Sequence, residues 1–207
     1  VDDNTLKALT QLGVKYNLRE EPNERKDKKD RFLYIPSLKL YVAKERTLQG
    51  KDWSDQHKGL EKDSTRMQII PEFVEFLKYV KENAPEIYED ITAVRSPWRA
   101  ENLDAYVEQR DDGMYILTGN KTKAEKLDTD TLMEDRTPGI SIESWLSNPT
   151  SQGLPRKDVE KGSLCYWYPR NDSVAWFGAD GDRTNFGCNR NPYYRYSDLG
   201  VRAVRHE

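Results

Sequence analysis

The chain has 207 residues, of which 36% are hydrophobic and 33% are charged, and its formal net charge is −3. This length and composition predict one medium globular domain with a full core, and the acidic balance argues against a general nucleic-acid binder, which needs a basic field. No apolar run reaches 18 residues, so the sequence predicts no membrane span.

The N-terminal part is predicted to be an extension that precedes the main domain. Residues 4–18 carry leucines three apart, an imperfect apolar face that predicts a short helix. Residues 19–31 (REEPNERKDKKDR) form a charge run typical of a linker or exposed loop. We therefore predict an N-terminal helix and charged linker over residues 1–31, followed by a single domain over residues 32–207.

The first half of that domain contains the clearest helix of the chain. Residues 32–42 alternate in hydropathy well enough for strands, with a break at Ile35-Pro36. The segment PEFVEFLKYVKE begins at Pro71, which suits the first helical position. Its apolar residues recur at the helical period and predict core packing: Phe73, Phe76, Leu77 and Val80.

The middle of the chain contains signals for a hairpin and a short helix. Residues 106–117 predict a β-hairpin around an Asp-Asp-Gly sequence, because Asp-Gly readily supplies positive φ. Residues 121–137 are polar, and we predict irregular structure there. Residues 141–146 predict a short helix that is capped by its first serine and turns Trp145 and Leu146 inward.

Three apolar stretches near the C-terminus predict strands, over residues 166–168, 174–177 and 199–204. The residues between the last two are rich in Gly and Asn and are predicted to form a loop region. Cys165 and Cys188 lie in or near this apolar frame and are predicted to be buried free thiols, with a disulfide between them as the alternative. Helices early in the chain and short strands with long loops late predict an α+β fold.

The last 46 residues also differ in composition from the rest. They contain no Lys, Gln or Met and a single terminal Glu, whereas the residues before Gly162 hold all 17 lysines and 16 of the 17 glutamates. An Asn codon whose two adenines change freely encodes Asn, Asp, Tyr, Ser, Gly, Arg, Phe and Cys, but never Lys, Glu, Gln, Met or Trp. Residues 178–205 therefore suggest a randomised surface closed by a fixed strand. A loop-rich tail that favours aromatic residues and turn formers is the alternative interpretation.

Several motifs add a family resemblance. They are Gly153-Leu154-Pro155, YWYP at 166–169, VAWF at 174–177, Asp182-Arg183 and LGVRAVR at 199–205, with weaker matches in YVAKE at 41–45 and IPEFVEFLKY at 70–79. On these residues the chain resembles the variable proteins of diversity-generating retroelements, especially the archaeal and archaeal-virus members. The resemblance covers most of the chain after residue 30. It implies a C-type lectin fold, of the broad kind shared with formylglycine-generating enzymes.

The resemblance implies a hypervariable set of side chains that bind ligand on a fixed backbone. We expect a C-type lectin-like domain over residues 32–207, with its variable region at about residues 170–198. The expected ligand-binding residues form one solvent-facing patch: Gly178, Asp180, Gly181, Asn185, Gly187, Asn189, Asn191, Tyr193, Tyr194, Arg195 and Tyr196. Tyr supplies large, stiff contact area, as in antibody paratopes. The expected frame consists of Val174, Trp176, Phe177, Leu199, Val201 and Val204.

Ligand display has two alternatives as the function of this chain. A divergent or inactive enzyme like the formylglycine-generating enzymes is one, but that family uses a closely spaced cysteine pair, which Cys165 and Cys188 do not match. We expect no catalytic residues, since the chain has only two histidines and no recognisable catalytic motif. A calcium-dependent sugar-binding lectin is the other. The EPN tripeptide that such lectins use for calcium occurs here at residues 21–23, but it lies in the charged N-terminal stretch. Asp180 and Asp182 could supply oxygen ligands, but their spacing is not that of an EF-hand calcium loop.

The expected partner is a protein or a cell-surface ligand, recognised without a metal and without a cofactor. Nucleic acid is not an expected partner, and neither is a membrane that the chain would span. The identity of the ligand, the oligomeric state and the location stay open at this point, with a virion or a cell surface as one option for the location.

Overall fold

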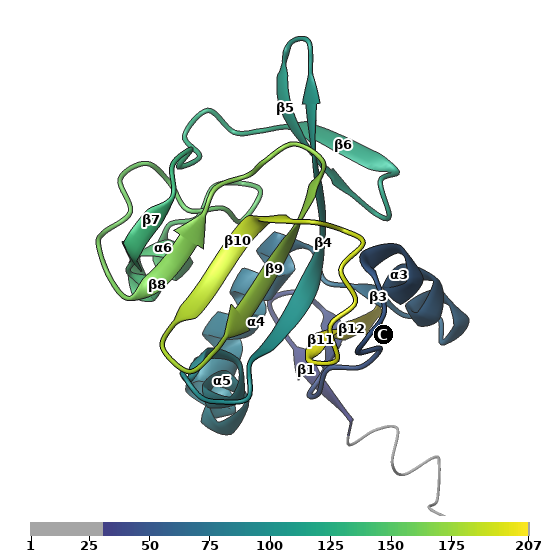
Figure 1. The fold of residues 1–207 in the computed structure, drawn as a ribbon. Coiled ribbons are helices and arrows are strands. Elements are labelled where there is room, and N and C mark those ends of the chain that lie inside the picture. The colour runs from purple at the N-terminus through teal and green to yellow at the C-terminus, as the bar shows by residue number, and fades with distance from the viewer. Residues whose placement is uncertain (1–30, 207) are drawn as a thin grey trace, which may run out of the picture. The chain divides into compact units, whose positions relative to one another are not determined.

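Two β-sheets organise residues 31–206, the part of the chain that the computed structural model describes (Figure 1). The predicted helix at residues 4–18 and nearly all of the predicted linker at residues 19–31 lie outside the described residues. The smaller sheet has the order β1-β2-β12-β3, with β1 at Phe32–Ile35, β2 at Leu40–Ala43, β12 at Ala203–His206 and β3 at Arg66–Met67. It joins the two ends of the domain, because β12 pairs antiparallel with β2.

The larger sheet carries the C-terminal strands in its centre. Its order is β6-β5-β4-β9-β10-β8-β7, and β11 pairs in parallel with β4. These strands are β4 (Arg99–Arg110), β5 (Gly113–Thr118), β6 (Lys123–Lys126), β7 (Arg136–Ile140), β8 (Leu164–Trp167), β9 (Ser173–Ala179), β10 (Thr184–Arg190) and β11 (Leu199–Val201). The strands β9 and β10 therefore have neighbours on both sides, which fixes their backbones through two hydrogen-bond ladders each.

Four helices are present among the described residues: α3 (Trp53–Lys62), α4 (Ile70–Asn83), α5 (Pro85–Thr92) and α6 (Ile142–Ser147). Figure 1 shows α4 crossing behind β9 and β10. With these helices and two sheets the fold is α+β, as predicted. No helix among residues 31–206 combines the length and the apolar character that a membrane crossing requires.

The main core lies between α4 and the larger sheet. The predicted apolar stripe of α4 is confirmed, since Phe73, Phe76, Leu77 and Val80 are all fully buried. Phe73 lies with its ring centroid 5.2 Å from that of Phe177 on β9. Full burial of each such side chain contributes roughly 1.5–3 kcal/mol. The helix begins one residue before Pro71, which is therefore its second residue.

The region between β9 and β11 corrects the predicted loop. Residues 184–190 (TNFGCNR) form β10, which pairs antiparallel with β9 and parallel with β8. Only Phe186 and Cys188 alternate toward the core, and both are fully buried. Asn and Gly are poor strand formers, so local propensity hides a strand whose stability comes from two neighbours and two apolar anchors. A loop remains over residues 191–198.

Other local predictions divide into confirmed and wrong ones. The hairpin is confirmed, with Gly113 at φ 138°, and so is the short helix α6, where the Ser141 hydroxyl accepts the Ser144 N–H at 3.1 Å. Residues 121–137 are less irregular than predicted, because KAEK forms β6 at the sheet edge with every residue exposed. Charged side chains suit an edge strand, since they discourage pairing with another chain. The pattern there has no apolar period to reveal it.

Candidate ligand-binding surface

The face of the larger sheet that points away from α4 carries the candidate site. Side chains alternate along β9 and β10, so Phe177 and Phe186 enter the core while Trp176 and Asn189 point the other way. The Trp176 indole N–H donates to the Asn189 side-chain oxygen at 3.0 Å, across the two strands. This bond holds the half-buried indole in place on the outer face.

An open cavity of about 550 Å³ lies on this face. Its walls come from three parts of the chain: the segment before β4, the β9–β10 pair and the loop after β10. The residues around it are Trp98, Trp176, Asp180, Asn189, Arg190, Tyr194 and Tyr196. The aromatic rings contact one another, with the Tyr196 centroid 5.7 Å from Trp98 and 5.3 Å from Tyr194. Aromatic walls with a few polar groups are typical of ligand sites.

Arg190 lies between the two indoles of this cavity. Its guanidinium carbon is 3.9 Å from the Trp176 ring centroid and 5.1 Å from that of Trp98. The residue is only 9% exposed. Burial lowers the pKa of Arg190 to about 10, and the phenols of Tyr196 and Tyr194 act in the opposite direction. The side chain remains charged at neutral pH, within an aromatic wall that attracts cations.

The loop that supplies the tyrosines is fastened to α3. Arg195 donates to Asp52 at 3.0 Å and to Asp55 at 3.0 Å. Burial alone would raise the pKa of Asp52, but hydrogen bonds from the Asp55 N–H and from Arg195 hold it below its ordinary value. Backbone bonds add to the attachment, since the Gly50 N–H donates to the Tyr196 carbonyl at 3.0 Å. The loop is therefore held in place both by the Arg195 side chain and by its backbone.

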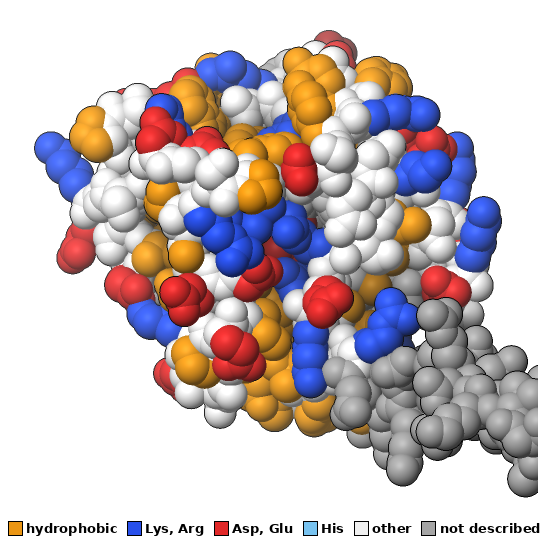
Figure 2. Space-filling model, turned by 60° about the horizontal axis from the view of Figure 1, so that its bottom comes forward, with side chains coloured by type: hydrophobic (Ala, Val, Ile, Leu, Met, Phe, Trp, Pro, Cys, Tyr) orange, Lys and Arg blue, Asp and Glu red, His pale blue; other side chains and the backbone are white. Residues whose placement is uncertain are grey.

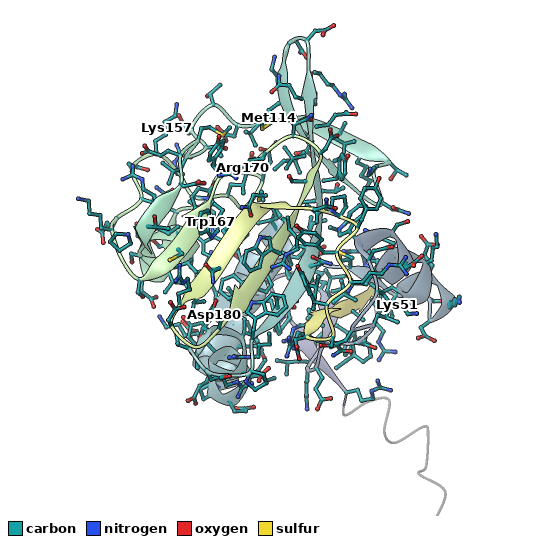
Figure 3. All side chains as sticks on the ribbon, in the orientation of Figure 1. Lys51, Met114, Lys157, Trp167, Arg170 and Asp180 are labelled. Atoms are coloured by element: carbon teal, nitrogen blue, oxygen red, sulfur yellow. The ribbon has the colours of Figure 1, made fainter. Side chains whose placement is uncertain are left out.

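The other end of the cavity is the turn between β9 and β10. The Asp180 side chain accepts the N–H groups of Asp182 and Arg183 at 3.1 Å each, which closes the turn. Arg183 pairs with Asp182 and is the main cause that lowers the pKa of that carboxyl to about 2. Among residues 31–206, no three His, Cys, Asp or Glu side chains converge to hold a metal ion. Figure 3 shows Asp180 at the end of β9 that lies away from Arg170.

The expected exposure of the eleven candidate residues is correct for some and wrong for others. Six are exposed: Gly181, Asn191, Tyr193, Tyr194, Arg195 and Tyr196. Among them, Tyr193, Tyr194 and Tyr196 are 78%, 46% and 47% exposed. Asp180 and Asn189 are half-buried, whereas Gly178, Asn185 and Gly187 are buried.

Strand pairing explains the three buried positions. A Cβ on Gly178 would come within 2.8 Å of the Arg99 carbonyl oxygen on the neighbouring strand. The Asn185 side chain accepts the Trp167 indole N–H at 3.3 Å, and the residue is buried. A Cβ on Gly187 would meet the Trp176 indole nitrogen at 2.8 Å. The predicted exposure of these residues is wrong because Gly178 lies on β9, and Asn185 and Gly187 on β10, and each of these strands is paired on both sides.

Four candidates meet in the cavity, namely Asp180, Asn189, Tyr194 and Tyr196. Tyr193, Asn191, Arg195 and Gly181 do not line it. The assignment of Trp176 to the frame is corrected, because its ring forms part of the cavity wall. Trp98 was missed altogether. Its only signal in the sequence is a Trp in a polar Ser-Pro-Trp-Arg segment, without the apolar period that marks a core residue.

Comparisons with known protein families, with curated proteins and with solved structures gave no match. The chemistry of the described residues is then the guide to function. Cys165 and Cys188 are both buried and free, and burial raises the pKa of the Cys188 thiol well above its ordinary range. A thiol held in its neutral form is a poor nucleophile and a poor metal ligand.

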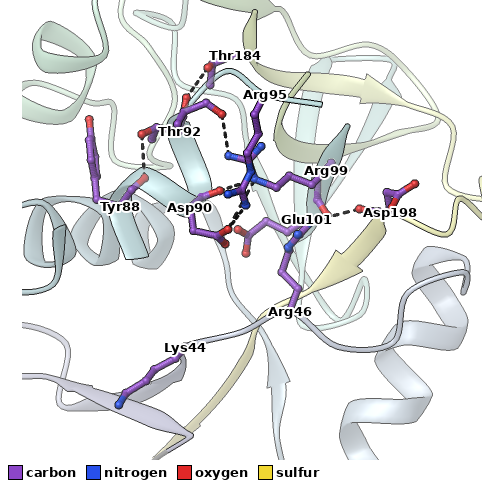
Figure 4. A network of polar contacts seen from close by, with 12 residues as sticks. Lys44, Arg46, Tyr88, Asp90, Thr92, Arg95, Arg99, Glu101, Thr184 and Asp198 are labelled. Atoms are coloured by element: carbon purple, nitrogen blue, oxygen red, sulfur yellow. Dashed lines mark hydrogen bonds and ion pairs between the residues drawn. The ribbon is translucent and has the colours of Figure 1, made fainter. Parts of the chain in front are cut away.

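A second charged region lies where α5 meets β4. Arg99 donates to the Ala93 carbonyl at 2.7 Å and also to the Asp90 carbonyl, while Arg46 donates to the Ala100 and Asp198 carbonyls at 3.1 Å each (Figure 4). The guanidinium groups in this network bind main-chain oxygens and carboxylates of the same domain. Figure 2 shows basic and acidic side chains interspersed on the face turned forward from the bottom of Figure 1. This mixed pattern presents no single-sign field.

Proposed function

We propose that the protein recognises a ligand through a diversified C-terminal surface carried by a C-type lectin fold. The observation that carries this proposal is the cavity of Trp98, Trp176, Arg190, Tyr194 and Tyr196, in which Trp176 and Arg190 lie on strands β9 and β10 of the larger sheet. Trp, Tyr and Arg are the residues that most often dominate binding energy at protein interfaces. A pre-ordered backbone limits the entropy that binding costs.

The exposed tyrosines support a protein or cell-surface molecule as the ligand. Tyr193, Tyr194 and Tyr196 are large exposed hydrophobic side chains, grouped within four residues of one loop. A large exposed aromatic area is unfavourable on a surface without a partner. Where such an area is contiguous, it marks an interaction site. The open cavity beside them suits a protruding side chain of a partner better than a fully enclosed small molecule.

The diversification part of the proposal is consistent with how the candidate residues lie. Gly181, Asn191, Tyr193, Tyr194 and Tyr196 are exposed in turns or loops, where side chains can be exchanged without disturbing the ladders. All five belong to the types that a modified Asn codon can encode. Phe177, Phe186 and Leu199, by contrast, are fully buried frame residues.

Sequencing the DNA beside this gene tests the proposal. We expect a second, near-identical copy of the segment that encodes residues 170–198, next to a reverse transcriptase gene, with differences at adenines only. The differing codons should fall on Gly181, Asn191, Tyr193, Tyr194 and Tyr196 and spare Gly178, because a Cβ there would clash with the neighbouring strand. A gene without such a repeat, or a repeat whose differences fall on frame codons, would contradict diversification.

A further inference from the structure

Three arginine side chains are buried within residues 31–206, and they differ in their partners. Arg202 donates to Glu101 at 3.1 Å and to the Ala43 carbonyl at 3.2 Å. Arg99 donates to the carbonyl oxygens of α5 and of the residue after it. Arg190, the third, lies in the cavity wall. Its Nε is buried without any hydrogen-bond acceptor among the described residues.

No carboxylate of the described residues neutralises Arg190. Burial is the main cause that lowers the pKa of Arg190, the phenol groups of Tyr196 and Tyr194 oppose it, and no Asp or Glu among residues 31–206 contributes. Asp180 lines the same cavity, but its hydrogen bonds are to the N–H groups of its own turn. The guanidinium is thus a buried cation that contacts indole faces and pairs with no carboxylate among residues 31–206.

The buried Nε–H of Arg190 has no acceptor among residues 31–206, which is unfavourable without a ligand. A buried charge is normally paired and hydrogen-bonded, because its removal from water is unfavourable. The faces of Trp98 and Trp176 attract the cation, but they accept no conventional hydrogen bonds from its five N–H donors. A guanidinium presents those donors as a planar fork that matches a carboxylate in two parallel bonds.

We propose that the cavity receives the carboxylate of an Asp or Glu side chain of a protein ligand, which pairs with Arg190 between the two indoles. The inference rests on the proposed function and specifies its ligand chemistry. One guanidinium and one carboxylate, Asp180, line the cavity, so a singly charged anion is favoured over a dianionic phosphate. The tyrosines around the cavity favour a protein as the source of that carboxylate, because Tyr-rich surfaces are typical of protein recognition.

Peptide display provides the test. The protein, as the full chain, is used to select binders from a library of random linear peptides. We expect the selected peptides to share an Asp or Glu. Replacing that residue by Gln or Asn in the peptide should weaken binding by at least about 30-fold, the effect of removing one partner of a buried charge pair. This substitution leaves the protein unchanged, so no folding defect can imitate the result.

Variants of the protein, combined with the peptide substitutions, complete a double-mutant cycle. Arg190→Gln should weaken binding of the acidic peptide as strongly as the substitution in the peptide does. The variant should bind the acidic and the amide peptides equally. Arg110→Gln is the matched control: its guanidinium lies 4.3 Å from the Tyr115 ring but is exposed and paired with Glu108 at 2.7 Å. It should leave the affinity unchanged.

The outcomes separate the two proposals. Peptides that lose affinity in Tyr194→Ser, but carry no shared acid and ignore Arg190→Gln, would overturn the carboxylate inference and leave the proposed function standing. The absence of any selected peptide would count against both proposals. A separate titration uses N-acetylneuraminic acid, a sugar with a carboxylate. Binding of that sugar that needs Arg190, without binding of acidic peptides, would overturn the choice of a protein source.

Discussion

Arg202 and Arg190 have similar burial but opposite surroundings. Arg202 is 1% exposed and is held by Glu101 and by main-chain carbonyls, so the domain itself supplies every partner. Arg190 is buried among indoles and has no anion within the described residues. A buried cation with internal partners joins strands together, whereas one that lacks them and lines a cavity can bind an external anion. Burial alone therefore does not separate an arginine that stabilises the fold from one that is available to a ligand. The presence or absence of an internal carboxylate does.

The largest loss of stability is expected when the ion pair between Arg202 and Glu101 is broken. Glu101→Gln removes the carboxylate from Arg202 and leaves a buried guanidinium unneutralised, which typically costs about 3–5 kcal/mol. Denaturant titration measures this loss in the free energy of unfolding. Glu108→Gln is the control, because it removes a carboxylate from an exposed arginine pair and should change stability by less than about 0.5 kcal/mol. Equal effects of the two changes would contradict a structural role for the buried pair.

A second expected difference separates the frame from the tyrosines. Leu199→Ala truncates a fully buried side chain and should cost about 2–5 kcal/mol. Replacing Tyr193, Tyr194 and Tyr196 together by Ser should move the melting temperature little, since these residues are 46–78% exposed. Thermal unfolding of both variants checks the comparison. If the triple variant were as unstable as Leu199→Ala, the tyrosines would belong to the fold.

The comparison also shows how far the sequence could predict this molecule. The stripe of α4 and the hairpin at residues 106–117 were predictable because their period or turn chemistry is local. The strand β10 was not, since Asn and Gly dilute its two apolar anchors and its stability comes from distant partners.

The site was predictable only in part. Aromatic residues in a polar tail pointed to Tyr194 and Tyr196, and both line the cavity. Trp98 comes from the segment before β4, and only tertiary structure places it beside Tyr196. The lack of a partner for Arg190 within the described part of the chain is likewise invisible in the sequence, because it depends on where the carboxylates lie in the fold.

A smaller effect is expected for Arg190→Gln on stability. The variant loses the contact with two indoles, worth roughly 0.5–2 kcal/mol, but it also removes a buried charge without an anion. The two terms oppose each other, so the free energy of unfolding should change by less than about 1 kcal/mol. Denaturant titration beside Glu101→Gln gives the direct comparison. A loss of several kcal/mol would place Arg190 in the same structural class as Arg202.

The smallest effect is expected from metal removal. Asp180 already accepts two backbone N–H groups and Asp182 pairs with Arg183, so the turn holds its shape through bonds of its own. Dialysis against a chelator should leave the thermal transition within about a degree, because only a ligand that binds the native state raises its stability. A transition that rises with free calcium would instead make these carboxylates metal ligands and favour a calcium-dependent lectin.

The central claim is that the residues that bind are separate from the residues that hold the fold. Two displayed libraries test it most directly, one randomised at Gly181, Asn191, Tyr193, Tyr194 and Tyr196, the other at Val174, Phe177, Phe186, Leu199 and Val201. Protease resistance of each clone reports whether it folds. We predict that most clones of the first library resist protease like the parent protein, and that nearly all clones of the second are digested. Similar loss of resistance in the two libraries would contradict the claim.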